Sequence, residues 1–138
     1  MPEKHMHDYA LWRLEKSADD LDTARICYDA GKYDAAANRA YYSVYHAIRA
    51  VLALDGIERS KHSGNISYFR EHYLATDIFD RTYSETIKKA EVLRNAADYK
   101  DMQTTSEEKA QDVIVKAYEF HNAVSAYISE KMLLTPYL

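Results

Sequence analysis

Helix-breaking residues are almost absent from the interior of this chain. Its 138 residues include three glycines and two prolines, and the prolines are Pro2 and Pro136, close to the two ends. Sandwiches and α/β folds need many more turns than three glycines can form, whereas long helices do not. The sequence therefore predicts an all-α fold, an up-and-down four-helix bundle with one additional short helix.

Apolar residues that recur every three or four positions divide the chain into helices. The first predicted helix covers residues 8–30 and ends at Gly31, because glycine adopts the left-handed conformation of a helix end without a steric penalty. The second covers residues 34–54, with Asp34 as its N-cap and Gly56 after its end. Its alanines and valines form a slim face that lets a neighbouring helix approach closely.

The additional short helix is expected after a polar loop that follows the second helix. Ser63 or Asn65 is the predicted cap of this helix, whose apolar side continues to Leu74. A further long helix is predicted to hold the apolar positions of residues 79–97 on one side.

A capping sequence predicts where the last helix begins. Residues 98–104 are polar and are predicted to form a loop. Thr105 and Glu108 then match the capping box, in which a hydroxyl residue is followed three positions later by an acid or amide. Apolar spacing continues from there to Ile128, so the chain is predicted to form a single domain over residues 1–138 with a core of about 8–130.

Composition narrows the class of protein further. No apolar run reaches the 18 residues that suggest a membrane span, so no membrane association is expected. The one cysteine, Cys27, excludes a disulfide framework, and a cytoplasmic protein is predicted. The formal net charge of -4 provides no overall attraction to nucleic acid or anionic lipid. Any function must therefore come from local groups of residues.

One such group lies on the second predicted helix. Arg39 and His46 are seven residues apart and project within about 20° of each other, with Tyr42 and Ser43 expected on the same side. Polar groups on an alanine-rich helix need partners, so they form either a buried hydrogen-bond network or a ligand-facing stripe. In the second case His46 would act as general acid or base and Arg39 would neutralise phosphate charge.

A second group lies at the end of the predicted 79–97 helix. Arg94 and Asp98 are four residues apart, close enough to pair on a helix, and Tyr99 follows at its rim. Taken alone, these residues indicate an ion pair at a helix end with an anchoring tyrosine.

A third group precedes the short helix. Lys61, His62 and Ser63 combine two basic side chains and a hydroxyl with the free N–H groups of a helix start, which together can hold an anion. Elsewhere, His5 and His7 lack the third ligand that a metal site needs, and no phosphate-binding or dinucleotide-binding motif is present. No metal or cofactor is predicted.

Taken together, the segments 38–46, 61–64 and 94–99 resemble the HEPN domain family, in particular its small prokaryotic members. The resemblance implies a four- or five-helix bundle that is frequently a homodimer. It also implies nucleotide or RNA binding or, in many members, metal-independent RNA cleavage in toxin–antitoxin or defence settings. The partner that it implies is a minimal nucleotidyltransferase protein.

The resemblance is incomplete at the residues that carry out cleavage. Nuclease members have an arginine followed after four to six residues by a histidine, commonly with an asparagine directly after the arginine. Arg94 and Asn95 match the start of this pattern, but Asp98 and Tyr99 stand where the histidine is expected. A carboxylate or a phenol does not exchange protons near neutral pH as an imidazole does.

Two hypotheses follow. In the first, the chain is a HEPN nucleotide- or RNA-binding module; if it cleaves RNA, His46 carries the proton while Arg39 and Arg94 stabilise the developing charge. The expected ligand-binding residues are Tyr42, Ser43, Lys61, His62, Ser63, Asp98 and Tyr99. In the second hypothesis, the chain is a non-catalytic helical dimerisation or interaction domain, and its polar residues only maintain packing.

Overall fold

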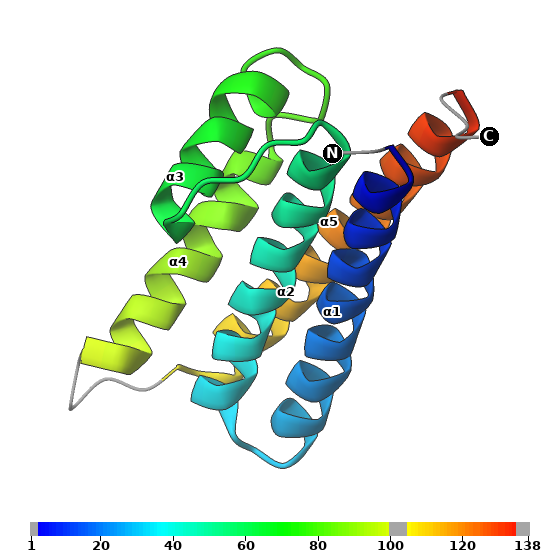
Figure 1. Ribbon diagram of the computed structural model, residues 1–138. Helices are drawn as coiled ribbons and strands as arrows, with labels where there is room; N and C mark the ends of the chain where they lie inside the picture. Colours follow the sequence, from blue (N-terminus) through cyan, green and yellow to red (C-terminus); the bar gives the residue numbers. More distant parts are fainter. Residues whose placement is uncertain (1–2, 100–104, 135–138) are drawn as a thin grey trace.

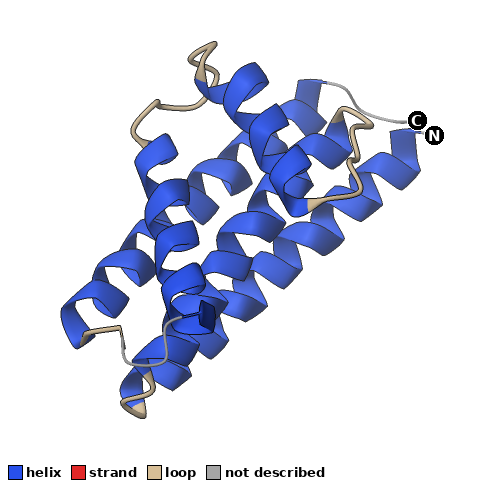
Figure 2. Ribbon diagram, turned by 90° about the vertical axis from the view of Figure 1, so that its left-hand side faces the viewer, coloured by secondary structure: helices blue, strands red, loops and turns tan. Residues whose placement is uncertain are grey.

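The chain folds into a bundle of four long helices with a short helix on one side (Figure 1). The computed structural model describes residues 3–99 and 105–134. The elements in order are α1 (Glu3–Asp29), α2 (Tyr33–Leu54), α3 (His62–Phe69), the π-helical turn η1 (Arg70–Leu74), α4 (Tyr83–Tyr99) and α5 (Glu107–Leu134). Figure 2 shows these residues as helices and loops without a strand. The predicted all-α, up-and-down bundle is confirmed.

Helix α2 is the centre of the bundle and packs against α1, α3, α4 and α5. Five of its alanine side chains are buried completely, which allows close packing because each adds only one methyl group to the interface. The fully buried alanines of α2 are Ala36, Ala37, Ala40, Ala47 and Ala50. The slim face predicted from the sequence is therefore the face on which the bundle is built.

Glycines end the first two helices as predicted. Gly31 has a φ of +76°, and its N–H donates to the carbonyl of Tyr28 while the N–H of Lys32 donates to the carbonyl of Cys27. This pair of bonds is the Schellman motif, which needs a left-handed residue after the helix. Gly56, with a φ of +69°, repeats the motif after α2.

Two predicted N-caps are wrong. Asp34 lies inside the first turn of α2, whose N-cap is Lys32, and its carboxylate accepts a hydrogen bond from the Thr105 N–H at 2.6 Å. At the start of α5 the capping oxygen is that of Ser106, which accepts from the Lys109 N–H at 3.1 Å. In both places the sequence offers adjacent polar residues, and a contact between distant segments decides which of them caps the helix.

Two predicted helix starts are also displaced. Helix α1 begins at Glu3 rather than at residue 8, and α4 begins at Tyr83 rather than at residue 79. Phe79 is buried all the same, because the loop before α4 folds its ring into the core. Asp77, with a φ of +63°, turns the chain there. Apolar spacing alone does not distinguish a buried loop residue from a helical one.

Candidate functional site

Arg39 and His46 face α1 from one side of α2, and both contact Asp20 of α1. Arg39 Nη1 is 3.1 Å from Asp20 Oδ1, and His46 Nε2 is 3.7 Å from Asp20 Oδ2. The seven-residue spacing therefore brings the guanidinium and the imidazole to one side of α2, as predicted. Asp20 was not among the predicted residues. Folding α1 back on α2 about the turn at Gly31 would have placed it opposite Arg39.

The His46 ring is held by basic groups on its other side. Arg13 Nη1 lies 2.9 Å from His46 Nδ1 and donates a hydrogen bond to it, so the ring proton is on Nε2, facing Asp20. Burial, and then the charges of Arg13 and Arg49, lower the pKa of His46 to about 4. Burial also raises the pKa of Asp20, although the neighbouring Arg39 opposes this shift. The imidazole is therefore neutral at pH 7.

Ser43 lies on a different side of α2 from the one predicted. It is completely buried, and its hydroxyl and carbonyl oxygens lie 3.0 and 2.8 Å from Ser17 Oγ. His121 Nδ1 lies 2.8 Å from the same Ser17 Oγ. Because Ser17 has one hydroxyl proton and donates it to the carbonyl, His121 Nδ1–H is the donor to Ser17. Ser43 thus belongs to a buried contact joining α1, α2 and α5.

Tyr42 lies between Arg39 of α2 and Arg94 of α4. The Arg39 guanidinium lies 4.9 Å from the centre of the Tyr42 ring, and that of Arg94 lies 5.5 Å from it. Arg94 also lies 4.8 Å from the centre of the Tyr41 ring. Cations over aromatic faces are attracted by the ring quadrupole. The two predicted arginines therefore share one tyrosine but differ in their other neighbours, since Arg39 pairs with Asp20 and Arg94 lies over Tyr41.

Arg94 lines a pocket of about 380 Å³ between α2, α3 and α4. Its lining consists of Tyr41, His62, Ser63, Ile66, Glu91, Arg94 and Asn95. Two of the three sequence groups therefore meet here, since the helix start at His62 faces the Arg94–Asn95 pair. Arg39 and His46 are not among the lining residues, so the three residues that the cleavage hypothesis assigns to one reaction lie in two neighbouring places.

His62 is exposed and rests on aromatic rings of α2. Its ring stacks on that of Tyr45 with the centres 3.9 Å apart, and the Tyr41 hydroxyl lies 3.4 Å from His62 Nδ1. Burial and the positive charge of Arg94 lower the pKa of His62. The ring is neutral at pH 7 and able to accept a proton. Lys61, at the N-cap of α3, is exposed beside it.

Asn65 holds the loop that carries these residues. It is completely buried, its Oδ1 accepts from the Arg59 N–H at 3.0 Å, and its Nδ2 contacts the Arg59 and Lys61 carbonyls. Nδ2 also donates to the Tyr45 hydroxyl at 3.0 Å. The prediction that Ser63 or Asn65 caps α3 is therefore wrong, since Lys61 is the N-cap and no side chain caps it. Asn65 instead fixes the loop to α2.

A chain of hydrogen bonds links Tyr45, on which His62 stacks, to Arg13, which contacts His46. Arg49 donates to the Tyr45 hydroxyl at 3.2 Å and to the Tyr9 hydroxyl at 3.0 Å, and it pairs with Glu58 at 2.7 Å. Arg13 in turn donates to the Tyr9 hydroxyl at 2.8 Å. These residues come from the N-terminal half of α1, the C-terminal half of α2 and the loop after it, so no local sequence pattern would have identified them together.

The remaining predicted site residues, Asp98 and Tyr99, belong to the last turn of α4. Their side chains lie outside the described residues, so the pairing of Asp98 with Arg94 and the place of Tyr99 at the rim stay predictions. Asn95, the other half of the Arg94–Asn95 match, lines the pocket.

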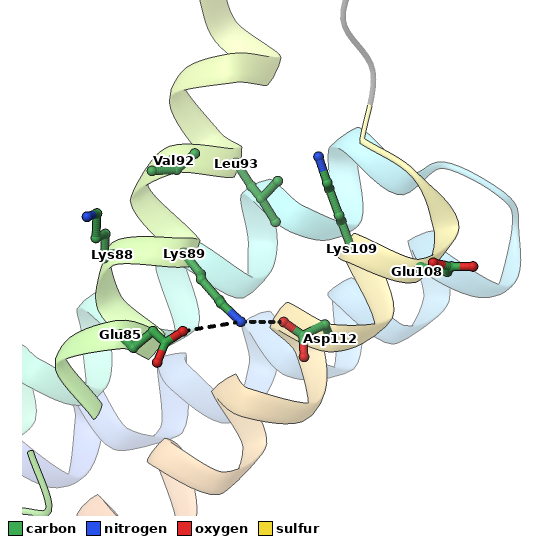
Figure 3. Close-up of a pocket in the computed structure, with 8 residues that line it drawn as sticks. All are labelled: Glu85, Lys88, Lys89, Val92, Leu93, Glu108, Lys109 and Asp112. Carbon is green, nitrogen blue, oxygen red and sulfur yellow. Dashed lines mark hydrogen bonds and ion pairs between the residues drawn. The ribbon is translucent and has the colours of Figure 1, made fainter. Parts of the chain in front are cut away.

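A larger hollow of about 660 Å³ lies between α4 and α5 (Figure 3). Lys89 reaches across it, 3.6 Å from Glu85 Oε1 and 3.4 Å from Asp112 Oδ2. It is lined by Glu85, Lys88, Lys89, Val92, Leu93, Glu108, Lys109 and Asp112. The absence of an imidazole or hydroxyl group from this lining makes the smaller pocket the better candidate for proton transfer.

Two further properties concern the described residues alone. They contain no cluster of three or more histidine, cysteine, aspartate or glutamate side chains arranged to hold a metal ion. In the same part of the chain, none of the helices has the length and apolarity required to cross a bilayer.

Comparison with known proteins places these features in a family. The model of the HEPN domain matches residues 10–127, which include α2, α3, α4 and every predicted site residue. The chain belongs to the HEPN domain family. The resemblance inferred from three short segments is confirmed by this match.

Relatives of this HEPN chain come from archaea and bacteria. Two proteins of Methanocaldococcus jannaschii are each named a putative toxin. The first is 30% identical to this chain, over 88% of this chain and 82% of its own length. The second is 29% identical, over 85% of this chain and 87% of its own length. A UPF0332 protein of Thermotoga maritima is 27% identical over 86% of this chain and 89% of its own length. The HEPN chain is thus similar to these proteins over most of their length.

Proposed function

We propose that this HEPN chain is a toxin-like module that binds RNA and cleaves it without a metal ion. The observation that carries the proposal is the pocket in which Arg94 and Asn95 of α4 face His62 and Ser63 at the start of α3. It supplies, from a different helix, the imidazole that the Arg94–Asn95 segment lacks. The names of the M. jannaschii relatives support the toxin-like role.

The chemistry follows from the charges in the pocket. Neutral His62 takes the proton of a ribose 2′-hydroxyl, whose oxygen forms a bond to the adjacent phosphorus while the bond to the 5′-oxygen breaks. Solvent protonates the leaving oxygen, so the products are a 2′,3′-cyclic phosphate and a 5′-hydroxyl. Arg94 stabilises the charge that develops on the phosphate oxygens. Ser63 and Asn95 are the neutral donors within the same pocket.

In this proposal His62 replaces His46 as the proton acceptor. His46 is held between Arg13 and Asp20, outside the pocket, and its pKa of about 4 makes it a weak base. Arg39, above the Tyr42 ring, contacts the phosphate of a neighbouring nucleotide. His46 holds Arg13 in place and does not exchange a proton with the substrate.

Cleavage of single-stranded RNA in EDTA tests the proposal. His62→Ala should lower the rate by about 100-fold or more, the usual contribution of a general base, and Arg94→Ala should lower it as well. His72→Ala is the matched control, because His72 is exposed on η1 and stacks on Tyr68 away from the pocket. Equal rates for wild type and His62→Ala would contradict the assignment. Loss of activity in His46→Ala alone would restore His46 as the proton carrier.

The proposal includes two partners. A second copy of the chain and a small nucleotidyltransferase protein are those implied by the family, and we expect both in the native assembly. Light scattering of the purified chain measures the first. The second partner is tested by co-purification with the product of an adjacent nucleotidyltransferase gene, if the genome has one. A monomer that retains no such partner would contradict the proposal of these two partners.

The second candidate is a helical interaction domain without a ligand. It is favoured by the contacts of Arg39 and His46 with Asp20, which join α1 to α2 as a packing network would. Under this hypothesis Arg39→Ala and His46→Ala each lower the free energy of unfolding by about 1–3 kcal/mol, which lowers the melting temperature. Nucleotides do not bind. A thermal melt measured beside a nucleotide titration separates the two candidates.

A further inference from the structure

An aromatic pair on α1, half-buried Tyr9 and exposed Trp12, lies next to Arg13, which contacts His46. The rings of Tyr9 and Trp12 are stacked, with centres 5.9 Å apart and planes 12° from parallel. Trp12 is 46% exposed. The Arg13 guanidinium and the Lys16 ammonium lie 5.1 and 5.4 Å from the centre of the Trp12 ring. A large flat ring is thus presented to solvent between two cations.

This arrangement matches the requirements of an unpaired nucleotide. Bases stack on aromatic rings whatever their sequence, and cations beside the ring attract the phosphates on either side of the base. A protein-binding surface would differ at Lys16, since lysine is depleted at the centre of such interfaces, whereas aromatic residues and arginine are enriched there. The Lys16 ammonium over Trp12 therefore favours RNA over a protein partner.

The aromatic pair is connected to the pocket through the bundle. Arg13 contacts the Trp12 ring and donates to His46 Nδ1, while Tyr9 accepts from Arg49, which also bonds Tyr45 beneath His62. Helix α2 separates α1 from α3 and α4 (Figure 1), and neighbouring helix axes are about 8–10 Å apart. A strand leaving the pocket reaches α1 after crossing one helix.

We propose that Tyr9 and Trp12 form a stacking platform for an unpaired base of single-stranded RNA whose cleavable phosphate lies in the His62–Arg94 pocket. The inference rests on the proposed function and names its substrate as single-stranded. The platform binds a base several nucleotides from the reacting phosphate and takes no part in proton transfer.

Tryptophan fluorescence tests the platform directly, because Trp12 is the only tryptophan of the chain. The full chain is titrated with a short oligouridylate, with an abasic oligonucleotide and with inorganic polyphosphate. The oligouridylate should quench Trp12 emission, whereas the two polyanions without bases should not. Anisotropy of labelled oligouridylate should show binding weakened about 10-fold by Trp12→Ala. The matched control is Leu11→Ala, since Leu11 is 47% exposed on the same helix.

Three other outcomes would each contradict the stacking platform. One outcome is that Arg94→Ala weakens RNA binding, while RNA leaves Trp12 emission unchanged and Trp12→Ala binds RNA as tightly as wild type. In that case the platform is wrong and the proposed function stands. If Trp12→Ala changes self-association and leaves RNA affinity unchanged, the surface contacts protein and the inference is overturned. If the wild-type chain binds no RNA, the proposed function fails and the platform fails with it.

Discussion

At the scale of single residues, His46 shows how burial controls charge on this face. Its pKa is about 4 in the folded chain and about 6.5 in the unfolded chain, so only the unfolded chain binds the proton between these values. Stability is therefore predicted to fall as the pH falls from 6.5 to 4, by about 3 kcal/mol at most from this ring. Urea unfolding over this range should show a smaller pH slope for His46→Gln than for wild type. Equal slopes would contradict the prediction.

Asn65 is the residue on which the pocket loop depends. Asn65→Ala removes the acceptor of the Arg59 N–H and one of the two donors to the Tyr45 hydroxyl, which keeps its hydrogen bond from Arg49. We expect a loss of about 2–3 kcal/mol in urea unfolding, together with weaker RNA binding because His62 is no longer held. Asn95→Ala is the control for stability: Asn95 is exposed, so its effect should stay within about 0.5 kcal/mol. Equal effects of the two substitutions would count against this role of Asn65.

At the scale of elements, the turn between α1 and α2 depends on one backbone conformation. A methyl group added at Gly31 would touch nothing within 4 Å, but its φ of +76° is unfavourable for alanine. Gly31→Ala is predicted to cost about 1 kcal/mol in thermal or urea unfolding. Gly31→Asn should cost less, because asparagine tolerates the left-handed region. Alanine as stable as wild type would contradict this reason.

The helix ends also show where local patterns are sufficient. Both glycine ends were predicted, because a left-handed residue after a helix is a local requirement that glycine meets. The caps predicted at Asp34, Asn65 and Thr105 are wrong, because each of these residues has a polar partner or a burial that comes from a distant segment. A capping pattern predicts that a helix begins nearby, and tertiary contacts decide which residue is the N-cap.

At the scale of the whole molecule, the bundle depends on the slim face of α2. Ala47 is completely buried there, so Ala47→Leu inserts three carbons into a packed core and is predicted to destabilise the protein by about 1–3 kcal/mol. Ala35→Leu is the matched control, because Ala35 is exposed on the same helix and the same change should shift stability by about 0.5 kcal/mol or less. Urea unfolding of both variants measures the difference. Equal losses of stability in the two variants would show that the change in helix propensity causes them, and would contradict the packing argument.

The candidate site could be predicted only in part. The seven-residue spacing of Arg39 and His46 correctly placed them on one side of α2, because helix geometry relates residues along one element. It gave no information about Asp20 and Arg13, which come from α1, or about His62, which faces Arg94 across the pocket. Ser43, adjacent to Tyr42, faces the core instead. Neighbours within a helix follow from spacing, whereas partners across helices follow from how the helices pack.

The amino-acid sequence by itself determined the all-α class, the glycine-ended helices, the slim face of α2 and the family, because each depends on residue order within a segment or a few segments. Only the tertiary structure decided that Arg94 meets His62 and that His46 meets Arg13 and Asp20. These pairs depend on the angle and register at which whole helices pack, and that packing is set by the sum of many core contacts. The chemistry of the pocket is therefore a property of the assembled bundle.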